Sequence, residues 1–135
     1  CAALAACRQP VPVDTSQARF IPVPVAVDHL KELLPTAEVV GSTVPVKVLF
    51  EAKEVQEWKV DAAAIEFRVA SRAPFRIAFP EITSTRVDKI LGGFQVRLFT
   101  DAQPDPKKHH FGFNFHDEAP ACRAIELIDA LRVKR

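Results

Sequence analysis

The sequence predicts an all-β protein, an antiparallel β-sandwich of immunoglobulin-like or jelly-roll-like type. Three observations support this prediction. Apolar and polar residues alternate in several short segments, as they do in strands that bury one face. Turn-forming residues separate these segments at intervals of about 10–15 residues, close to the spacing in sandwich domains. The chain has 135 residues, 48% of them hydrophobic, which is enough for one domain with one core.

One short helix is expected near the start of the domain. Residues 20–27 alternate apolar residues with two prolines, which lack a backbone N–H, so we expect an edge strand or an extended surface segment there. Asp28 is placed to cap a helix over residues 28–34, in which three leucines share one face. Pro35 is expected to end that helix.

The clearest strands form a hairpin. The apolar residues of its two arms alternate with polar ones, and residues 71–74 form the turn between them. These apolar residues are Ile65, Phe67 and Val69 in the first arm and Phe75, Ile77 and Phe79 in the second. The same alternation predicts strands at residues 44–50, 94–98 and 111–115.

The C-terminal segment, residues 121–133, fits either a strand or a helix. Residue propensities favour a helix slightly, and basic residues near its end would suit one. A strand with a bulge would suit the surrounding strands better. We favour the strand and keep the helix as the alternative.

The N-terminal residues resemble an export signal. Residues 1–6 are small and apolar, whereas residues 8–19 are polar and rich in proline. The motif Leu4-Ala5-Ala6-Cys7 resembles the lipobox of bacterial lipoprotein precursors. This resemblance implies that Cys7 is lipidated and that the protein belongs to the bacterial cell envelope. The expected organisation is a residual signal tail at 1–6, an anchor cysteine with a flexible tether at 7–19, and a single β-sandwich domain at 20–135.

A disulfide between Cys7 and Cys122 is the competing interpretation of the same cysteine. The three cysteines, at positions 1, 7 and 122, show no C-x-x-C pair and no zinc-ligand spacing. In an oxidising compartment a Cys7–Cys122 bond would join the two ends of the domain. Lipidation and the disulfide exclude each other.

The residues that could carry catalysis do not form a convincing set. His109, His110 and His116 lie too far apart along a strand, or on opposite faces, to converge on one metal ion. No serine lies in a G-x-S-x-G motif. A hydrolase based on Cys122 is disfavoured, because a reactive thiol needs a lowered pKa. We therefore predict no catalytic residue, no metal and no cofactor.

The candidate ligand-binding residues are three arginines and one tryptophan. Arg68, Arg76 and Arg97 fall on the polar face of predicted strands and would form a basic stripe if those strands were adjacent. The alternative is an ordinary solvated face, balanced by nearby acids. Trp58 is either a contact residue for a ligand or a cap on the end of the core.

These observations favour an exported, lipid-anchored binding or structural accessory protein that is not an enzyme. Its expected partners are the membrane, through the anchor, and a protein or glycan of the envelope. Arg8 follows Cys7, which by resemblance to bacterial sorting rules favours the outer membrane or a periplasm-facing position. The net charge of +1 argues against nucleic acid. The alternative is a carbohydrate- or small-ligand-binding module of a larger secreted enzyme.

Overall fold

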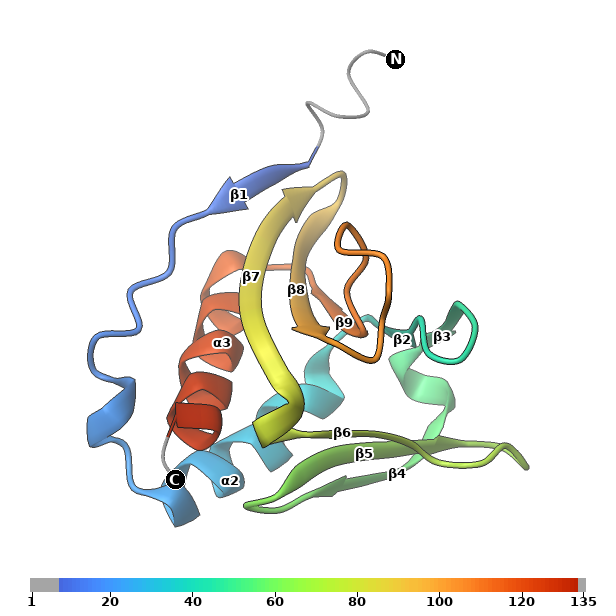
Figure 1. The fold of residues 1–135 in the computed structure, drawn as a ribbon, viewed down its shortest axis with the longest axis horizontal. Coiled ribbons are helices and arrows are strands. Elements are labelled where there is room, and N and C mark those ends of the chain that lie inside the picture. The colour runs from blue at the N-terminus through green and yellow to red at the C-terminus, as the bar shows by residue number, and fades with distance from the viewer. Residues whose placement is uncertain (1–7, 134–135) are drawn as a thin grey trace.

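The structure, a computed structural model, describes residues 8–133, and its elements are drawn in Figure 1. In this part of the chain nine strands and two α-helices alternate with short 3₁₀ turns. They are β1 (Gln9–Val11), α2 (Val23–Leu33), β2 (Val39–Ser42), β3 (Val48–Glu51), β4 (Val55–Val60), β5 (Ala64–Val69), β6 (Phe75–Ala78), β7 (Ile82–Ile90), β8 (Gly93–Thr100), β9 (Phe111–Phe115) and α3 (Glu118–Val133).

The strands form two antiparallel sheets. Six strands make the larger sheet, in the order β1-β7-β8-β9-β2-β3, and β4, β5 and β6 make the smaller one. This arrangement is compatible with a β-sandwich, so the predicted fold class is confirmed. Aromatic rings join the two sheets at one end. Phe67 on β5 lies with its ring centroid 5.5 Å from that of Phe111 on β9 and 6.4 Å from that of Phe50 on β3.

The predicted hairpin is formed by the antiparallel strands β5 and β6. Phe67 pairs with Phe75, and Ile65 pairs with Ile77, so the apolar residues of both arms share one face. Phe67 and Ile77 are completely buried, which explains why the alternation in the sequence is so regular here.

The C-terminal segment is a helix, so the strand that we favoured for residues 121–133 is wrong. Four residues spaced by three or four positions, Ala124, Leu127, Ile128 and Leu131, are buried at 0–2% exposure. Helix α3 packs on β7, β8 and β9 (Figure 1). The helix therefore covers the part of the larger sheet that the smaller sheet does not reach.

The helix near the N-terminus is longer than predicted and begins earlier. Residues 23–33 are helical, whereas we expected an extended segment up to residue 27. Pro22 is the N-cap and Pro24 lies in the first turn, where a backbone N–H has no helical partner in any case. The prolines that suggested an edge strand therefore mark the start of a helix.

Part of the expected tether belongs to the sheet. Gln9–Val11 form β1, which pairs with β7 at the edge of the larger sheet. Pro10 is tolerated there because an edge strand needs hydrogen bonds on one side only. The expected signal tail and Cys7 lie outside the described residues.

Candidate functional site

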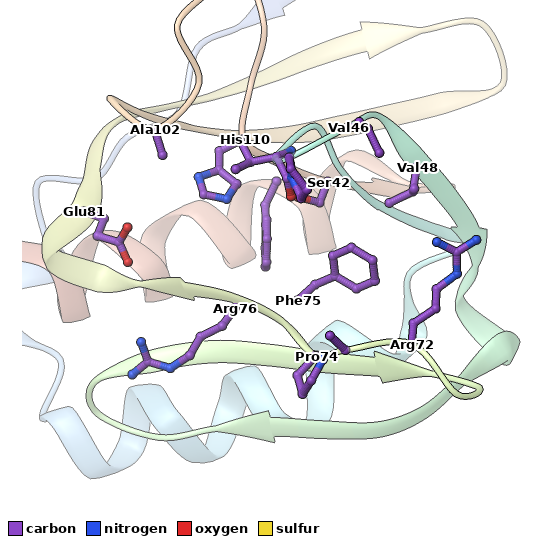
Figure 2. Close-up of a pocket in the computed structure, with 14 residues that line it drawn as sticks. Ser42, Val46, Val48, Arg72, Pro74, Phe75, Arg76, Glu81, Ala102 and His110 are labelled. Carbon is purple, nitrogen blue, oxygen red and sulfur yellow. The ribbon is translucent and has the colours of Figure 1, made fainter.

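One candidate site is a cavity of about 580 Å³ between the two sheets (Figure 2). Its walls come from the loop between β2 and β3, the turn between β5 and β6, and the start of β9. The lining is mostly apolar. The lining residues are Ser42, Val44, Pro45, Val46, Val48, Arg72, Ala73, Pro74, Phe75, Arg76, Glu81, Ala102, His110 and Phe111.

The packing of the two sheets explains why the cavity is there. Phe67 and Phe75 stack with their centroids 5.1 Å apart, and Phe50 lies 5.7 Å from Phe75. These rings fill the space between the sheets beside the cavity. Val46, at the cavity mouth, is 65% exposed, which is unusual for a branched apolar side chain. The cavity thus has an apolar interior and an apolar opening.

His110 supplies a polar group inside the cavity. It is 5% exposed, and its Nδ1 lies 2.6 Å from the Thr100 hydroxyl. Burial lowers the pKa of His110, so the imidazole is neutral at pH 7. Figure 2 shows the ring on the side of the cavity opposite Phe75. A neutral imidazole there can exchange a hydrogen bond with a ligand but cannot balance a ligand's charge.

Two arginines lie at opposite ends of the cavity (Figure 2). Arg76 shares its end with Glu81, and its Nε is 4.0 Å from a carboxylate oxygen of Glu66, so its charge is offset by acids. Arg72 lies 5.3 Å above the Phe50 ring, and within the described residues it has no ion pair. Arg72 is therefore the cation of this site that remains available to a ligand.

The three arginines singled out from the sequence do not form a stripe. Arg68 and Arg76 lie on neighbouring strands of the smaller sheet, but their cross-strand partners are Glu57 and Glu66. Arg68 Nη2 is 3.3 Å from Glu57, an exposed ion pair. Arg97 is on β8 in the larger sheet. Sequence reasoning could not assign these strands to separate sheets.

Trp58 packs into the core and does not line the cavity. Its ring centroid lies 5.7 Å from that of Phe67 and 6.2 Å from that of Phe113. It therefore bridges the smaller and the larger sheet, in agreement with the interpretation of this residue as a cap on the core.

The sequence analysis missed a cluster of charged residues around Asp88 on β7. Asp88 is completely buried, and its Oδ2 accepts hydrogen bonds from Arg86 at 2.9 Å, Arg97 at 3.0 Å and Arg8 at 3.3 Å. Burial raises the pKa of Asp88, but the three guanidinium donors outweigh it and hold the pKa below its usual range. Asp88 is thus a buried carboxylate that stays ionised.

A signal for this cluster exists in the sequence. Gly92, with φ of 87°, turns the chain between β7 and β8 and sets the register in which Arg86 faces Arg97. Asp88 faces Gln95 in the next pair on the same face. The alternation in the sequence predicts no strand at residues 82–90, so the pairing of this segment with β8 was not expected.

His109 belongs to the same cluster, since it is hydrogen-bonded to Arg97. Arg97 Nε donates to its Nδ1 at 3.0 Å, and a Cβ at Gly112 would come within 2.6 Å of its ring. A side chain at position 112 would therefore push the His109 ring from this place. Burial lowers the pKa of His109 to about 4, and the charge of Arg97 adds to this effect. His109 is therefore neutral at pH 7.

Cys122 and Cys7 are the remaining residues that the sequence analysis singled out. Cys122 is half-buried on α3, and burial raises the pKa of its thiol, opposite to what a nucleophile requires. Cys7, its proposed disulfide partner, lies outside the described residues. Across residues 8–133, no group of three or more His, Cys, Asp or Glu side chains is arranged to hold a metal ion.

The fold and the cavity define a two-sheet β protein whose helix α3 backs the larger sheet and whose ligand-sized cavity opens between the sheets. No protein family, no curated protein and no solved structure matches this chain. Neither helix in the described residues combines the length and the apolar character needed to cross a membrane.

Proposed function

We propose that this protein is a non-catalytic binding protein whose ligand has an apolar body and one acidic group. The observation that supports the proposal is the cavity between the sheets, whose volume of about 580 Å³ falls within the range of small-molecule sites. Apolar side chains make up most of its lining, so burial of an apolar body would supply most of the binding free energy.

The charged side chains at the two ends of the cavity determine where an acidic head group of the ligand would bind. Arg72 has no ion pair within the described residues, whereas Arg76 lies beside Glu66 and Glu81. An anionic head group is therefore favoured at the Arg72 end and disfavoured at the Glu81 end. This difference would orient a long ligand in one direction, with His110 as a neutral hydrogen-bonding group along its length.

A carbohydrate ligand, the alternative expected from the sequence, is less well supported. Sugar sites commonly expose aromatic rings, and Trp58 packs between Phe67 and Phe113 instead. A saturated chain with a carboxylate fits the apolar lining better. Decanoate is a suitable probe because it has both parts in one small molecule.

Arg72→Gln is expected to weaken the binding of decanoate about fivefold, because an exposed, charge-assisted contact contributes about 1 kcal/mol. Isothermal titration calorimetry measures the change. The same substitution should leave the binding of decanol, which has no charge, almost unaltered.

Arg68→Gln is the matched control, since Arg68 is also an exposed arginine on the smaller sheet but does not line the cavity. Ala102→Trp, at an exposed lining position, should fill the cavity and reduce the binding of both probes. An equal loss in Arg68→Gln and Arg72→Gln, or strong binding that survives Ala102→Trp, would contradict the proposal.

We also propose that the protein acts at the bacterial cell envelope, held to the membrane by a lipid on Cys7. The support is the lipobox-like motif Leu4-Ala5-Ala6-Cys7. Arg8, the next residue, is ion-paired with Asp88, so such an anchor would hold the edge of the larger sheet close to the membrane. In that position the protein could serve a protein or glycan partner of the envelope.

The intact mass of the protein isolated from its native membranes tests this anchor. The expected result is a chain that begins at Cys7 and carries a diacylglyceryl group that a reducing agent does not release. A Cys7→Ser variant should lose its membrane association. A disulfide between Cys7 and Cys122, or an unmodified and reduced Cys7, would refute lipidation.

A further inference from the structure

The buried cluster around Asp88 carries more positive than negative charge. Arg8, Arg86 and Arg97 all bind the single carboxylate of Asp88, and His109, with a pKa of about 4, adds no charge at pH 7. Three guanidinium groups and one carboxylate leave two positive charges uncompensated. A bound dianion would make this cluster neutral.

Two of these arginines are placed side by side, although like charges in that position repel. Arg86 and Arg97 are direct cross-strand partners on β7 and β8. Both guanidinium groups lie over the Phe99 ring, with Cζ to centroid distances of 6.0 Å and 5.0 Å. Two adjacent guanidinium groups on an aromatic ring form a site that an oxyanion can bridge.

The cluster borders a second cavity of about 550 Å³, which shares no lining residue with the first. Ser84, Arg86, Arg97, Phe99 and Lys107 contribute to its lining, so cations and a hydroxyl group face the same space. Ser84 pairs with Phe99, two pairs along from Arg86 and Arg97 and therefore on the same sheet face.

The key guanidinium group is held in place before any ligand binds. Arg97 donates from Nη1 to Asp88, from Nε to His109 and from Nη2 to the Lys107 carbonyl at 2.9 Å. It is 7% exposed, so little conformational freedom remains to be lost on binding. Arg86 uses only Nη2 in its described hydrogen bond, and its side chain is 44% exposed. It can therefore turn remaining N–H donors toward the cavity.

We propose that this second cavity binds a dianionic tetrahedral oxyanion, the phosphoryl group of a small phosphomonoester or free phosphate. Arg86 and Lys107 supply the adjustable cations, Arg97 supplies a rigid one, and Ser84 supplies a hydroxyl donor. A dianion is preferred because the three cations that line the cavity, Arg86, Arg97 and Lys107, together with the carboxylate of Asp88, leave two positive charges there. This site is independent of the apolar cavity and of its proposed ligand.

Titration calorimetry with inorganic phosphate and with phenyl phosphate, at pH 8 and low salt, tests the site on the full chain. Arg86→Gln should weaken binding about tenfold or more, and Lys107→Gln about threefold. Sulfate should bind and acetate should not, since only sulfate is a dianion. Decanoate binding to the first cavity should stay unchanged in both variants.

Two matched variants serve as controls. Lys108→Gln changes the neighbouring lysine, which is also exposed but does not line this cavity, and Arg68→Gln changes an exposed arginine of the other sheet. Both should keep phosphate affinity within about twofold of the unmodified protein. Thermal unfolding checks that Arg86→Gln still folds, and Lys107→Gln, whose side chain has no described hydrogen bond, remains decisive if it does not.

Absent phosphate binding, or equal losses in Lys107→Gln and Lys108→Gln, would overturn the proposal. A third arm uses vesicles of phosphatidylglycerol, a phosphodiester with a single negative charge. Vesicle binding that depends on Arg86, together with no binding of the soluble phosphates, would also overturn it and indicate a membrane-surface contact instead.

Discussion

Asp88→Asn is expected to lower the free energy of unfolding by about 3 kcal/mol or more, because it leaves a buried arginine without its counter-charge. Asp88 is completely buried, and Arg97, its partner at 3.0 Å, is 7% exposed. Arg8 and Arg86 can move into solvent when the carboxylate is lost, but Arg97 cannot. Urea unfolding at pH 7, followed by circular dichroism, measures the difference.

A second substitution separates the charge effect from general damage to the sheet. Arg97→Gln in the Asp88→Asn background removes the uncompensated cation and should recover part of the lost stability. Asp101→Asn, an exposed acid on the neighbouring loop, is the control and should change stability by less than about 0.5 kcal/mol. A double variant that is less stable than Asp88→Asn by the full cost of Arg97→Gln alone would show that the two groups are not coupled.

Acidification from pH 6.5 to pH 4 is expected to destabilise the protein by up to about 3 kcal/mol through His109 alone. The pKa of His109 is about 4 in the folded protein, below the ordinary value of 6.5. In this pH interval His109 binds a proton in the unfolded chain but stays neutral in the folded protein. The folded state therefore loses stability as the pH falls. Chemical unfolding measured at several pH values gives the slope.

His109→Gln should flatten that slope, because glutamine can accept from Arg97 but does not titrate. His110, whose pKa is also lowered by burial, contributes in the same direction and keeps part of the slope. The pKa of Asp88 is lowered, so its contribution is lost only below the unfolded value of 3.8, outside this interval. His116→Gln is the exposed control and should not flatten the slope, because hydrogen bonding to Asp117 raises the pKa of His116. A slope that is the same with and without His109 would contradict the assignment.

Local alternation is the part of the fold that sequence reasoning predicts well. The β5–β6 hairpin has one buried face, so Ile65, Phe67 and Ile77 must alternate with polar residues, and the pattern is readable without tertiary information. The C-terminal helix is harder, because most of its surface is apolar and several faces contact the rest of the protein. Its buried residues therefore fit more than one period, and the packing on the sheet decides between them.

The extended segment predicted up to residue 27 was wrong because prolines are compatible with two different structures. A proline excludes a helix interior and a central strand, but it is equally acceptable at an edge strand and in a first helical turn. Pro22 and Pro24 fall in the second situation, and only the burial of Ala26 and Leu30 against the rest of the protein distinguishes the two.

Both candidate sites are made by residues that are far apart in the sequence. Their positions depend on which strands are neighbours in the sheets, and local sequence patterns do not reveal this. Arg97 lies on a strand, as predicted, but it is buried. It is ion-paired with Asp88 and faces Arg86, and both of these residues are on β7, where no strand was predicted. The cavity between the sheets was not predicted either. It is made by loops whose approach to one another follows from the packing of Phe50, Phe67 and Phe75.

If the cavity between the sheets is the site at which the protein binds its ligand, NMR mapping of bound decanoate should locate the ligand there. We predict that decanoate shifts the backbone amides of Val46, Ala73, Phe75, Ala102 and His110. Nuclear Overhauser contacts from the methylene group next to its carboxylate should place that end of the ligand near Arg72. The amides of α3 should remain unchanged and serve as an internal reference. Shifts confined to α3 or to other surfaces, or no shifts at all, would contradict the claim.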